Sequence, residues 1–220
     1  MPNRLDLLIH LARRGGYKRY LEIGVAGGQT FRAVPCEWKA GIDPLPGLGT
    51  VTATSDEYFT ALPIGVKFDL ILVDGDHRSE WALRDALHSL DHLSPGGTIV
   101  MHDCLPTAAE QMVLPGDRYG CYTGDVWRVM ATLARHPMLD CAVGDFDWGC
   151  GVIVNRRNPA RFDGAMPSIR DWKWEQYAQA PGSLFPILAW PELLAWWAGS
   201  ELVTADGYSR RGKVWVPQST

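Results

Sequence analysis

The chain has 220 residues, 46% of them hydrophobic, and a formal net charge of −4. This length suits one large domain around a single core, and the slightly acidic balance argues against a nucleic-acid binder that relies on a general basic field. The five cysteines are scattered, odd in number and without a C-x-x-C spacing, which disfavours a disulfide framework or a structural zinc site and favours a reducing cytoplasm.

Hydrophobic periodicity predicts alternating helices and strands along most of the chain. The N-terminal stretch MPNRLDLLIHLARRGG is amphipathic, but too short and too charged for a signal peptide or a membrane span, and no later segment is apolar enough to cross a bilayer. In chain order we expect helices over 3–14, 31–38, 55–62, 79–93 and 125–136, and strands over 17–24, 39–46, 50–55, 68–76, 98–103, 139–143 and 149–155, of which the last two can pair antiparallel. Pro35 should cut the second helix short, Ser55 or Asp56 should cap the third, and SPGG should stop the fourth, with Trp81 toward the sheet. Asp125 should cap the fifth helix, with Trp127 on its core face.

This alternation predicts the α/β fold class, with a doubly wound, mostly parallel, Rossmann-like sheet. We expect the core to occupy residues 1–158. The composition then changes, and six of the ten tryptophans lie after this point: Trp172, Trp174, Trp190, Trp196, Trp197 and Trp215. We expect 159–220 to form a Trp-rich helical extension of the same globular unit, serving as a cap over the sheet, a lid or a contact in a homo-oligomer.

The stretch YLEIGVAGGQT places Glu22, Gly24 and Gly28 where the first strand turns into a helix. Glycine lets the backbone pass close to a ligand, although a tight turn needs glycine without any ligand. The spacing is not G-x-G-x-x-G, and an acid at Glu22 would repel a pyrophosphate, so the turn disfavours NAD and suits a cationic or hydroxyl-bearing ligand. Asp43 ends the second strand, where an acid can accept both hydroxyls of a ribose or simply form a turn before Pro44.

Titratable side chains follow two further strands at the point where each one ends. The sequence DLILVDGDH places Asp74, Asp76 and His77 after one strand, and His102 and Asp103 follow the next. Ligands bind beyond the carboxyl ends of parallel strands, so these groups should open on one crevice. Several carboxylates without obvious Lys or Arg partners repel one another, and a divalent cation held by Asp74, His102 and Asp103 is the simplest compensation. The alternative is that each site is only a turn, with His102 packed as a neutral neighbour of the site.

The segments LEIGVAGGQT, GIDP, VDGDHRSE, LSPGGTIVMHDC and GDVWRVM…DWGCGVI resemble the class I S-adenosylmethionine-dependent methyltransferases, specifically the metal-assisted O-methyltransferases of bacterial sugar and natural-product pathways. The resemblance spans residues 17–155. It implies S-adenosylmethionine as cofactor, in a pocket lined by Glu22, Gly24, Gly28, Asp43 and Asp74, with Thr54, Ser55 and Asp56 near the adenine. It also implies Mg²⁺ held by carboxylates. Histidine at position 102 departs from that pattern and leaves Mg²⁺, Mn²⁺, Fe²⁺ and Zn²⁺ open, because imidazole favours the transition metals.

The expected function is therefore methyl transfer from S-adenosylmethionine to a hydroxyl of a small molecule, either a sugar or glycan precursor or a natural product. Coordination to a divalent ion acidifies a hydroxyl, and a nearby base can then remove its proton. His77 is the preferred base and Asp76 the other candidate, unless His77 faces solvent at the start of the next helix.

Three alternatives remain open at this stage. Catechol-like acceptors would chelate the same ion. A ferrous hydroxylase would hold iron with His77, His102 and either Asp74 or Asp103. A protein that binds S-adenosylmethionine without catalysis would have lost its metal.

Overall fold

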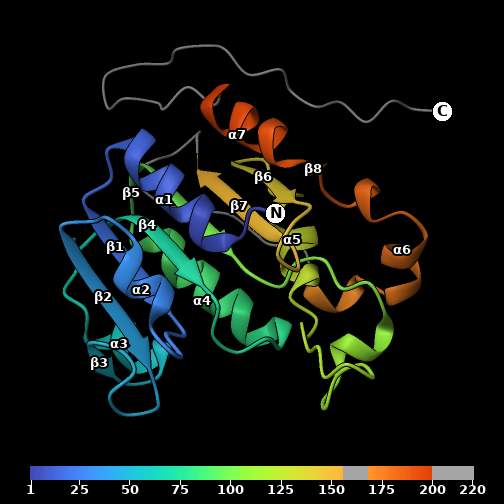
Figure 1. Cartoon of the computed structure of the whole chain (residues 1–220), viewed down its shortest axis with the longest axis horizontal. Helices are drawn as coiled ribbons and strands as arrows, with labels where there is room; N and C mark the ends of the chain where they lie inside the picture. Colours follow the sequence, from blue (N-terminus) through green and yellow to red (C-terminus); the bar gives the residue numbers. More distant parts are fainter. Residues whose placement is uncertain (156–167, 200–220) are drawn as a thin grey trace.

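The computed structural model describes residues 1–155 and 168–199. Within these residues, eight strands form one sheet in the order β3-β2-β1-β4-β5-β7-β6-β8 (Figure 1). The strands are β1 (Arg19–Ile23), β2 (Trp38–Asp43), β3 (Val51–Thr52), β4 (Phe68–Val73), β5 (Leu93–Met101), β6 (Leu139–Gly144), β7 (Cys150–Asn155) and β8 (Ile187–Leu188). The pairs among β1 to β5 are parallel, whereas β7 runs antiparallel to β5 and β6. The predicted α/β, mostly parallel sheet is confirmed.

Helices cover both faces of the sheet, as a doubly wound fold requires (Figure 1). The α-helices are α1 (Arg4–Gly15), α2 (Gln29–Ala33), α3 (Ser55–Ala61), α4 (Ser79–Asp91), α5 (Trp127–Leu133), α6 (Trp174–Gln179) and α7 (Trp190–Gly199). Three short 3₁₀ helices, η1 (Ala109–Met112), η2 (Ile169–Asp171) and η3 (Pro181–Ser183), lie in the connections. Buried residues of α1 and α7 pack in one cluster and those of α3, α4 and α5 in another.

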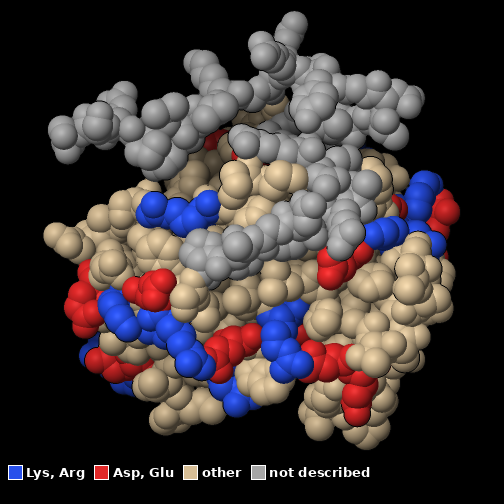
Figure 2. All heavy atoms as spheres, turned by 180° about the vertical axis from the view of Figure 1, so that it is seen from behind, with Lys and Arg blue, Asp and Glu red and all other residues tan. Residues whose placement is uncertain are grey.

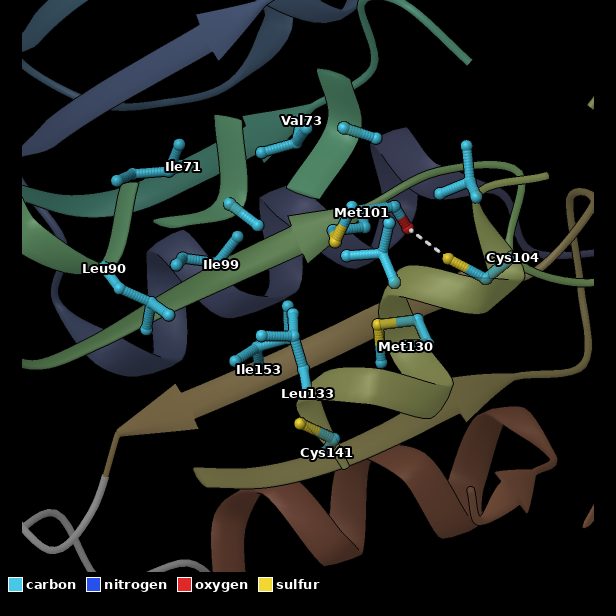
Figure 3. Packing of buried hydrophobic residues seen from close by; sticks show 14 of the residues in the cluster. Ile71, Val73, Leu90, Ile99, Met101, Cys104, Met130, Leu133, Cys141 and Ile153 are labelled. Carbon is cyan, nitrogen blue, oxygen red and sulfur yellow. Dashed lines mark hydrogen bonds between the residues drawn. The ribbon is translucent and has the colours of Figure 1, made fainter. Parts of the chain in front are cut away.

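The central strands supply side chains to both clusters in alternation. Leu70 and Leu72 of β4 belong to the cluster of α1 and α7, whereas Ile71 and Val73 belong to that of α4 and α5. Figure 3 shows the second cluster, in which Ile71 and Val73 lie on the same side of the sheet as Leu90. This alternation explains why DLILV is continuously apolar, since a parallel strand between two helical layers is buried on both faces.

The start of α3 differs from the prediction by one residue. Its N-cap is Thr54 rather than Ser55 or Asp56, because the Thr54 hydroxyl accepts a hydrogen bond of 3.3 Å from the Glu57 backbone N–H. The Glu57 carboxylate in turn accepts one of 2.9 Å from the Thr54 N–H. A threonine followed three residues later by glutamate is the capping-box pattern, which fixes the first turn.

The SPGG stretch belongs to a strand instead of ending a helix. Helix α4 ends at Asp91 and β5 begins at Leu93. The pairing of β4 with β5 shifts register between Phe68 and Leu70. A Cβ on Gly97 would lie 2.8 Å from the Asp69 carbonyl oxygen, so glycine lets the two strands approach closely at this irregularity.

Asp125 caps a helix other than the one that follows it. Its carboxylate accepts hydrogen bonds of 2.6 Å from the Ser79 N–H and 2.9 Å from the Ser79 hydroxyl, at the first residue of α4. The predicted capping of 125–136 by Asp125 is therefore wrong, and the N-cap of α5 is Val126, which makes no side-chain cap bond. Trp127 is fully buried, as predicted.

The described part of the C-terminal segment packs on the sheet. β8 pairs in parallel with β6, and the Trp197 indole of α7 donates a hydrogen bond of 3.0 Å to the Thr98 hydroxyl of β5. C-terminal helices are thus present, as expected. Trp215 and the rest of 200–220, as well as 156–167, lie outside the described residues.

The surface carries charges of both signs. On the face shown in Figure 2, Lys and Arg side chains lie beside Asp and Glu side chains instead of gathering in one basic patch, in keeping with the net charge of −4. Within 1–155 and 168–199, every helix is too short or too polar to cross a bilayer.

The glycine at position 24 allows the ends of β1 and β4 to meet. Gly24 has φ +85°, and a Cβ there would lie 2.1 Å from the Asp74 carbonyl oxygen. Gly47 has a nearly equal φ of +82° but open space around the Cβ position, so it makes a matched control. We expect Gly47→Ala to cost about 1–2 kcal/mol of unfolding free energy, from backbone strain alone. Gly24→Ala should cost about 1–3 kcal/mol more, because of the clash. Urea unfolding measures both, and equal losses would contradict this reading.

Candidate active site

A cavity of about 860 Å³ lies at the carboxyl ends of β1, β2, β4 and β5. Its lining contains eleven of the twelve site residues predicted from sequence: Glu22, Gly24, Asp43, Thr54, Ser55, Asp56, Asp74, Asp76, His77, His102 and Asp103. Gly28 does not belong to the lining; it has φ +71° at the start of α2 and supports the turn. The prediction that these strand ends share a crevice is confirmed.

Asp43 holds the glycine turn against β2. One carboxylate oxygen accepts hydrogen bonds of 3.1 Å from the N–H groups of both Val25 and Ala26, and the other accepts one of 2.9 Å from Leu45 N–H. These three bonds use most of the four or so acceptor positions of a carboxylate. Asp43 therefore forms part of the cavity wall, and its carboxylate can accept about one further hydrogen bond, for example from a ligand.

Glu22 is a buried acid on the cavity wall. Its side chain is only 2% exposed and accepts a hydrogen bond of 2.6 Å from the Tyr20 hydroxyl, two residues earlier on the same face of β1. Burial raises the pKa of Glu22 to about 7, although the bond from Tyr20 opposes the shift. A cationic group in the cavity would be stabilised by the ionised form of this acid.

Helices α3 and α4 form the wall beyond Asp43. Asp56 forms an ion pair with Arg84, and its Oδ1 lies 3.5 Å from His88 Nε2. Asp85 also lines the cavity; it is 4% exposed, and burial raises its pKa to about 6. Trp81 is 40% exposed at the same wall, so the prediction that it packs toward the sheet is wrong.

The ends of β4 and β5 carry a compact cluster of acids and imidazoles. The ladder continues beyond both strands, because His102 N–H donates to the Val73 carbonyl at 3.1 Å. His102 Nδ1 consequently lies 3.3 Å from Asp74 Oδ1 and 3.1 Å from Asp103 Oδ2. His77 Nε2 lies 3.3 Å from the same oxygen of Asp103 and 3.8 Å from Asp74 Oδ1.

Two members of this cluster were not predicted from sequence. Arg4, the first residue of α1, places Nε 3.3 Å from Asp74 Oδ2. Asp147, in the turn between β6 and β7, accepts a hydrogen bond of 2.7 Å from the Arg4 backbone N–H and lies 3.4 Å from His102 Nε2. The premise that the acids lack a basic partner is therefore wrong, since Arg4 neutralises part of their charge.

These neighbours determine the charge of His102. Burial lowers the pKa of His102, but hydrogen bonds to Asp103, Asp147 and Asp74 outweigh this effect and raise it to about 11. The hydrogen bond from His102 in turn lowers the pKa of Asp147 to about 2. His102 is thus an imidazolium among three carboxylates, and its proton and Arg4 supply the positive charge there.

His77 is fixed by the loop that follows β5. Its Nδ1 lies 3.3 Å from the Tyr122 carbonyl oxygen, and the two rings stack at a centroid distance of 5.5 Å. Asp125 N–H also donates to the His77 carbonyl at 3.1 Å. A proton on Nδ1 would be directed at this carbonyl and would leave Nε2, which faces the cluster, as the acceptor nitrogen. His77 therefore faces the cavity, with a side chain only 24% exposed.

Asp76 has a different environment from His77. Its carboxylate accepts hydrogen bonds of 2.9 and 3.1 Å from Arg78 Nε, and its side chain is 38% exposed. These bonds lower the pKa of Asp76. The pairing makes Asp76 a weaker base than an unpaired carboxylate.

The donor set at the strand ends fits a divalent cation. Asp74, His102 and Asp103 each offer a ligand atom, and these atoms lie within 4.8 Å of one another. His77 is not part of any such group in the described residues, so the facial triad with two imidazoles at one iron is not formed there. His102 also forms a second group of this kind with Asp147 and Cys150.

Comparison with known proteins finds methyltransferases of similar fold. Residues 45–104 match a family described as a methyltransferase domain. Comparison with curated proteins gives no significant match. A candidate caffeoyl-CoA O-methyltransferase from Staphylococcus aureus is 16% identical, with a TM-score of 0.54 over 70% of this chain and 85% of that one.

Two other solved structures give the same result. The O-methyltransferase TomG from Streptomyces achromogenes, in complex with S-adenosylmethionine, is 17% identical, with a TM-score of 0.52 over 69% of this chain and 79% of that one. A candidate O-methyltransferase from Klebsiella pneumoniae is 20% identical, with a TM-score of 0.50 over 70% and 80%. At such identities the likeness establishes the fold, which is the one that the sequence resemblance implied.

The raised pKa of Glu22 predicts a dependence of stability on pH. Because the folded-state pKa of about 7 exceeds the ordinary value of 4.5, the folded state binds the proton more tightly than the unfolded state. The resulting penalty is absent below pH 4.5 and grows as the pH rises to about 7. We expect the free energy of unfolding of Glu22→Gln to rise relative to that of the wild type by about 3 kcal/mol between the two ends of this pH window. Urea unfolding over the pH range tests it, with the same change at exposed Glu175 as control. Parallel curves for wild type and Glu22→Gln would contradict the prediction.

Proposed function

We propose that this chain, which carries a methyltransferase domain with the class I fold, transfers a methyl group from S-adenosylmethionine to a hydroxyl oxygen of a small molecule with the help of a divalent cation. One observation carries the proposal. The ends of β4 and β5 bring Asp74, His102 and Asp103 within bonding reach of one ion, at the cavity that the glycine turn of β1 also lines.

Three features support S-adenosylmethionine as the cofactor. Glu22 offers a buried acid for the ammonium of a bound amino acid, Gly24 lets the backbone approach, and Asp43 closes the turn. The predicted adenine side, at Thr54 to Asp56, lines the same cavity. The solved structure of TomG, which shares the fold, contains this cofactor.

Asp74, Asp103 and Nδ1 of His102 would hold the cation. When bound, such an ion lowers the pKa of a coordinated hydroxyl and positions it. Holding it requires His102 to release the proton from Nδ1. Arg4 contacts Oδ2 of Asp74, whereas Oδ1 is the oxygen that faces Nδ1, so the guanidinium can stay in place. The double positive charge of the ion would replace the charge that the proton on Nδ1 now supplies to the carboxylates.

We propose His77 as the general base. Its Nδ1 is directed to the Tyr122 carbonyl, so its Nε2 can accept a proton from a hydroxyl held beside Asp103. The cavity walls align the acceptor oxygen with the methyl group, which is the main contribution a protein makes to an in-line displacement.

For the acceptor, we propose a sugar, a glycan precursor or another natural product with a free hydroxyl. The sequence resemblance to the O-methyltransferases of such pathways supports this class, and TomG is described as acting in tomaymycin synthesis. Catechol-like compounds stay in the panel because adjacent hydroxyls chelate one ion. We also propose a reducing cytoplasm as its location, because five scattered cysteines without a C-x-x-C spacing disfavour a disulfide framework.

A turnover assay tests this function. The purified protein is incubated with S-adenosylmethionine and Mg²⁺ or Mn²⁺, together with monosaccharides, sugar nucleotides or catechols, and S-adenosylhomocysteine and methylated product are measured by mass spectrometry. We expect product formation that a chelator abolishes and added metal restores. Binding of S-adenosylmethionine without turnover on any hydroxyl would favour a non-catalytic role, and oxygen-dependent hydroxylation with Fe²⁺ would favour a hydroxylase.

His77 and Asp76 give a matched test of the base. We expect His77→Ala to lower kcat by about 10²–10⁴-fold without weakening the binding of S-adenosylhomocysteine, because only proton transfer is lost. Added imidazole should restore part of the rate. Asp76→Asn should change kcat little, since that carboxylate is paired with Arg78. The assignment would be wrong if Asp76→Asn were the more damaging change.

A further inference from the structure

The turn between β6 and β7 has an unusual backbone. Asp147 and Trp148 have φ values of +48° and +60°, and Gly149 follows with +89°. Residues other than glycine rarely adopt this left-handed region, and consecutive ones do so only where the surroundings hold them. Here the Trp148 and Gly149 carbonyls accept hydrogen bonds of 2.8 and 3.0 Å from the N–H groups of Leu105 and Cys104. The turn is thus anchored to the segment that directly follows Asp103.

This backbone directs the Asp147 side chain toward the cluster from the side away from the cavity. Its Oδ2 accepts a hydrogen bond of 2.7 Å from the Arg4 backbone N–H. The same oxygen lies 3.4 Å from both Arg4 Nη1 and His102 Nε2. Asp147 does not line the cavity, whereas His102 does. Asp147 therefore contacts His102 on the side of the ring away from the cavity.

The two ring nitrogens of His102 consequently have different tasks. Nδ1 faces Asp74 and Asp103, which line the cavity. When Nδ1 offers its lone pair to a cation, the ring proton must be on Nε2 and needs an acceptor. Among the described residues near Nε2, Arg4 offers only N–H donors and Asp147 offers a carboxylate oxygen. A histidine ligand held by a carboxylate on its other nitrogen is oriented and made more basic.

We propose that Asp147 is a positioning residue: it holds His102 with Nδ1 toward Asp74 and Asp103 and so sets the affinity of this site for a divalent cation. This inference rests on the metal assistance in the proposed function. It assigns a task to the strained turn and to the histidine that departs from the carboxylate pattern of the resembling enzymes.

A competing use of the same atoms involves Cys150. His102, Asp147 and Cys150 also offer ligand atoms within 4.8 Å of one another. A cation there would occupy Nε2 and exclude the hydrogen bond to Asp147. Neither Asp147 nor Cys150 lines the cavity, and the Cys150 thiol is fully buried, so the Nδ1 side is the one that ions and substrates reach.

The test is titration of metal-stripped protein with Mn²⁺ alone by calorimetry. We expect Asp147→Asn to weaken Mn²⁺ binding by about 10–100-fold, the usual effect of losing such a partner. Asparagine keeps an oxygen for the Arg4 N–H, so the start of α1 should be preserved. Asp145→Asn makes the same change two residues away at an exposed position and should leave Mn²⁺ affinity unaltered. Binding of S-adenosylhomocysteine checks that both variants are folded.

The outcomes separate this inference from the function itself. If wild type binds Mn²⁺ and Asp147→Asn binds it equally well, the role of Asp147 is overturned while metal-assisted transfer stands. If wild type binds no divalent ion yet binds S-adenosylhomocysteine, both the metal assistance and this inference fail.

Two measurements on the wild-type chain need no variant. In the Zn²⁺ complex, ¹H–¹⁵N correlation spectra should show His102 protonated at Nε2, and protonation at Nδ1 would overturn the proposal. A sulfur-to-metal charge-transfer band in the Co²⁺ complex would also overturn it, because that band would place Cys150 at the ion.

Discussion

Three carboxylates surround one imidazole at the carboxyl edge of the sheet. Asp74, Asp103 and Asp147 lie 3.3, 3.1 and 3.4 Å from the ring nitrogens of His102. Acids this close together, and largely shielded from water, need positive charge between them. The protonated ring supplies one positive charge and Arg4 supplies another. These charges connect the N-terminal helix, two strand ends and the β6–β7 turn in one network of electrostatic contacts. Any cation that enters the site must replace part of this positive charge.

The other acids of the cavity are held in different ways, and this separates their properties. Asp43 is tied down by three backbone N–H groups, Glu22 is kept partly protonated by burial, and Asp76 is paired with Arg78 in contact with solvent. A rigid acid, a titratable acid and a paired surface acid therefore line one cavity. This division suits the proposed function, in which the site would bind a sulfonium amino acid and orient an acceptor while His77 takes a proton.

The sequence predicted the sheet and most of the cavity because both follow from local rules. Apolar runs that end in polar residues mark the carboxyl ends of parallel strands, and neighbouring ends share a crevice. Asp74 and His102 are adjacent for this reason. Arg4 and Asp147 could not be found in this way, since packing of α1 and a left-handed turn bring them to the cluster from 70 and 73 residues away from Asp74.

Other differences have the same origin in tertiary contacts. Asp125 has the sequence position of a cap for α5, yet the loop after β5 carries it to the start of α4. Trp81 fits the apolar pattern of its helix but lies at the cavity wall, and Asp85 on the same helix is buried there beside it. Helical periodicity identifies a face, but the neighbours of that face decide whether it meets the sheet or the cavity.

The most direct test of the account is a crystal structure of the protein with Mn²⁺ and S-adenosylhomocysteine, analysed by anomalous diffraction. The account predicts a single manganese peak bonded to Asp74, Asp103 and Nδ1 of His102, with the nucleoside in the adjoining cavity. A cavity that contains the nucleoside while no manganese is bound between the two strand ends would contradict it.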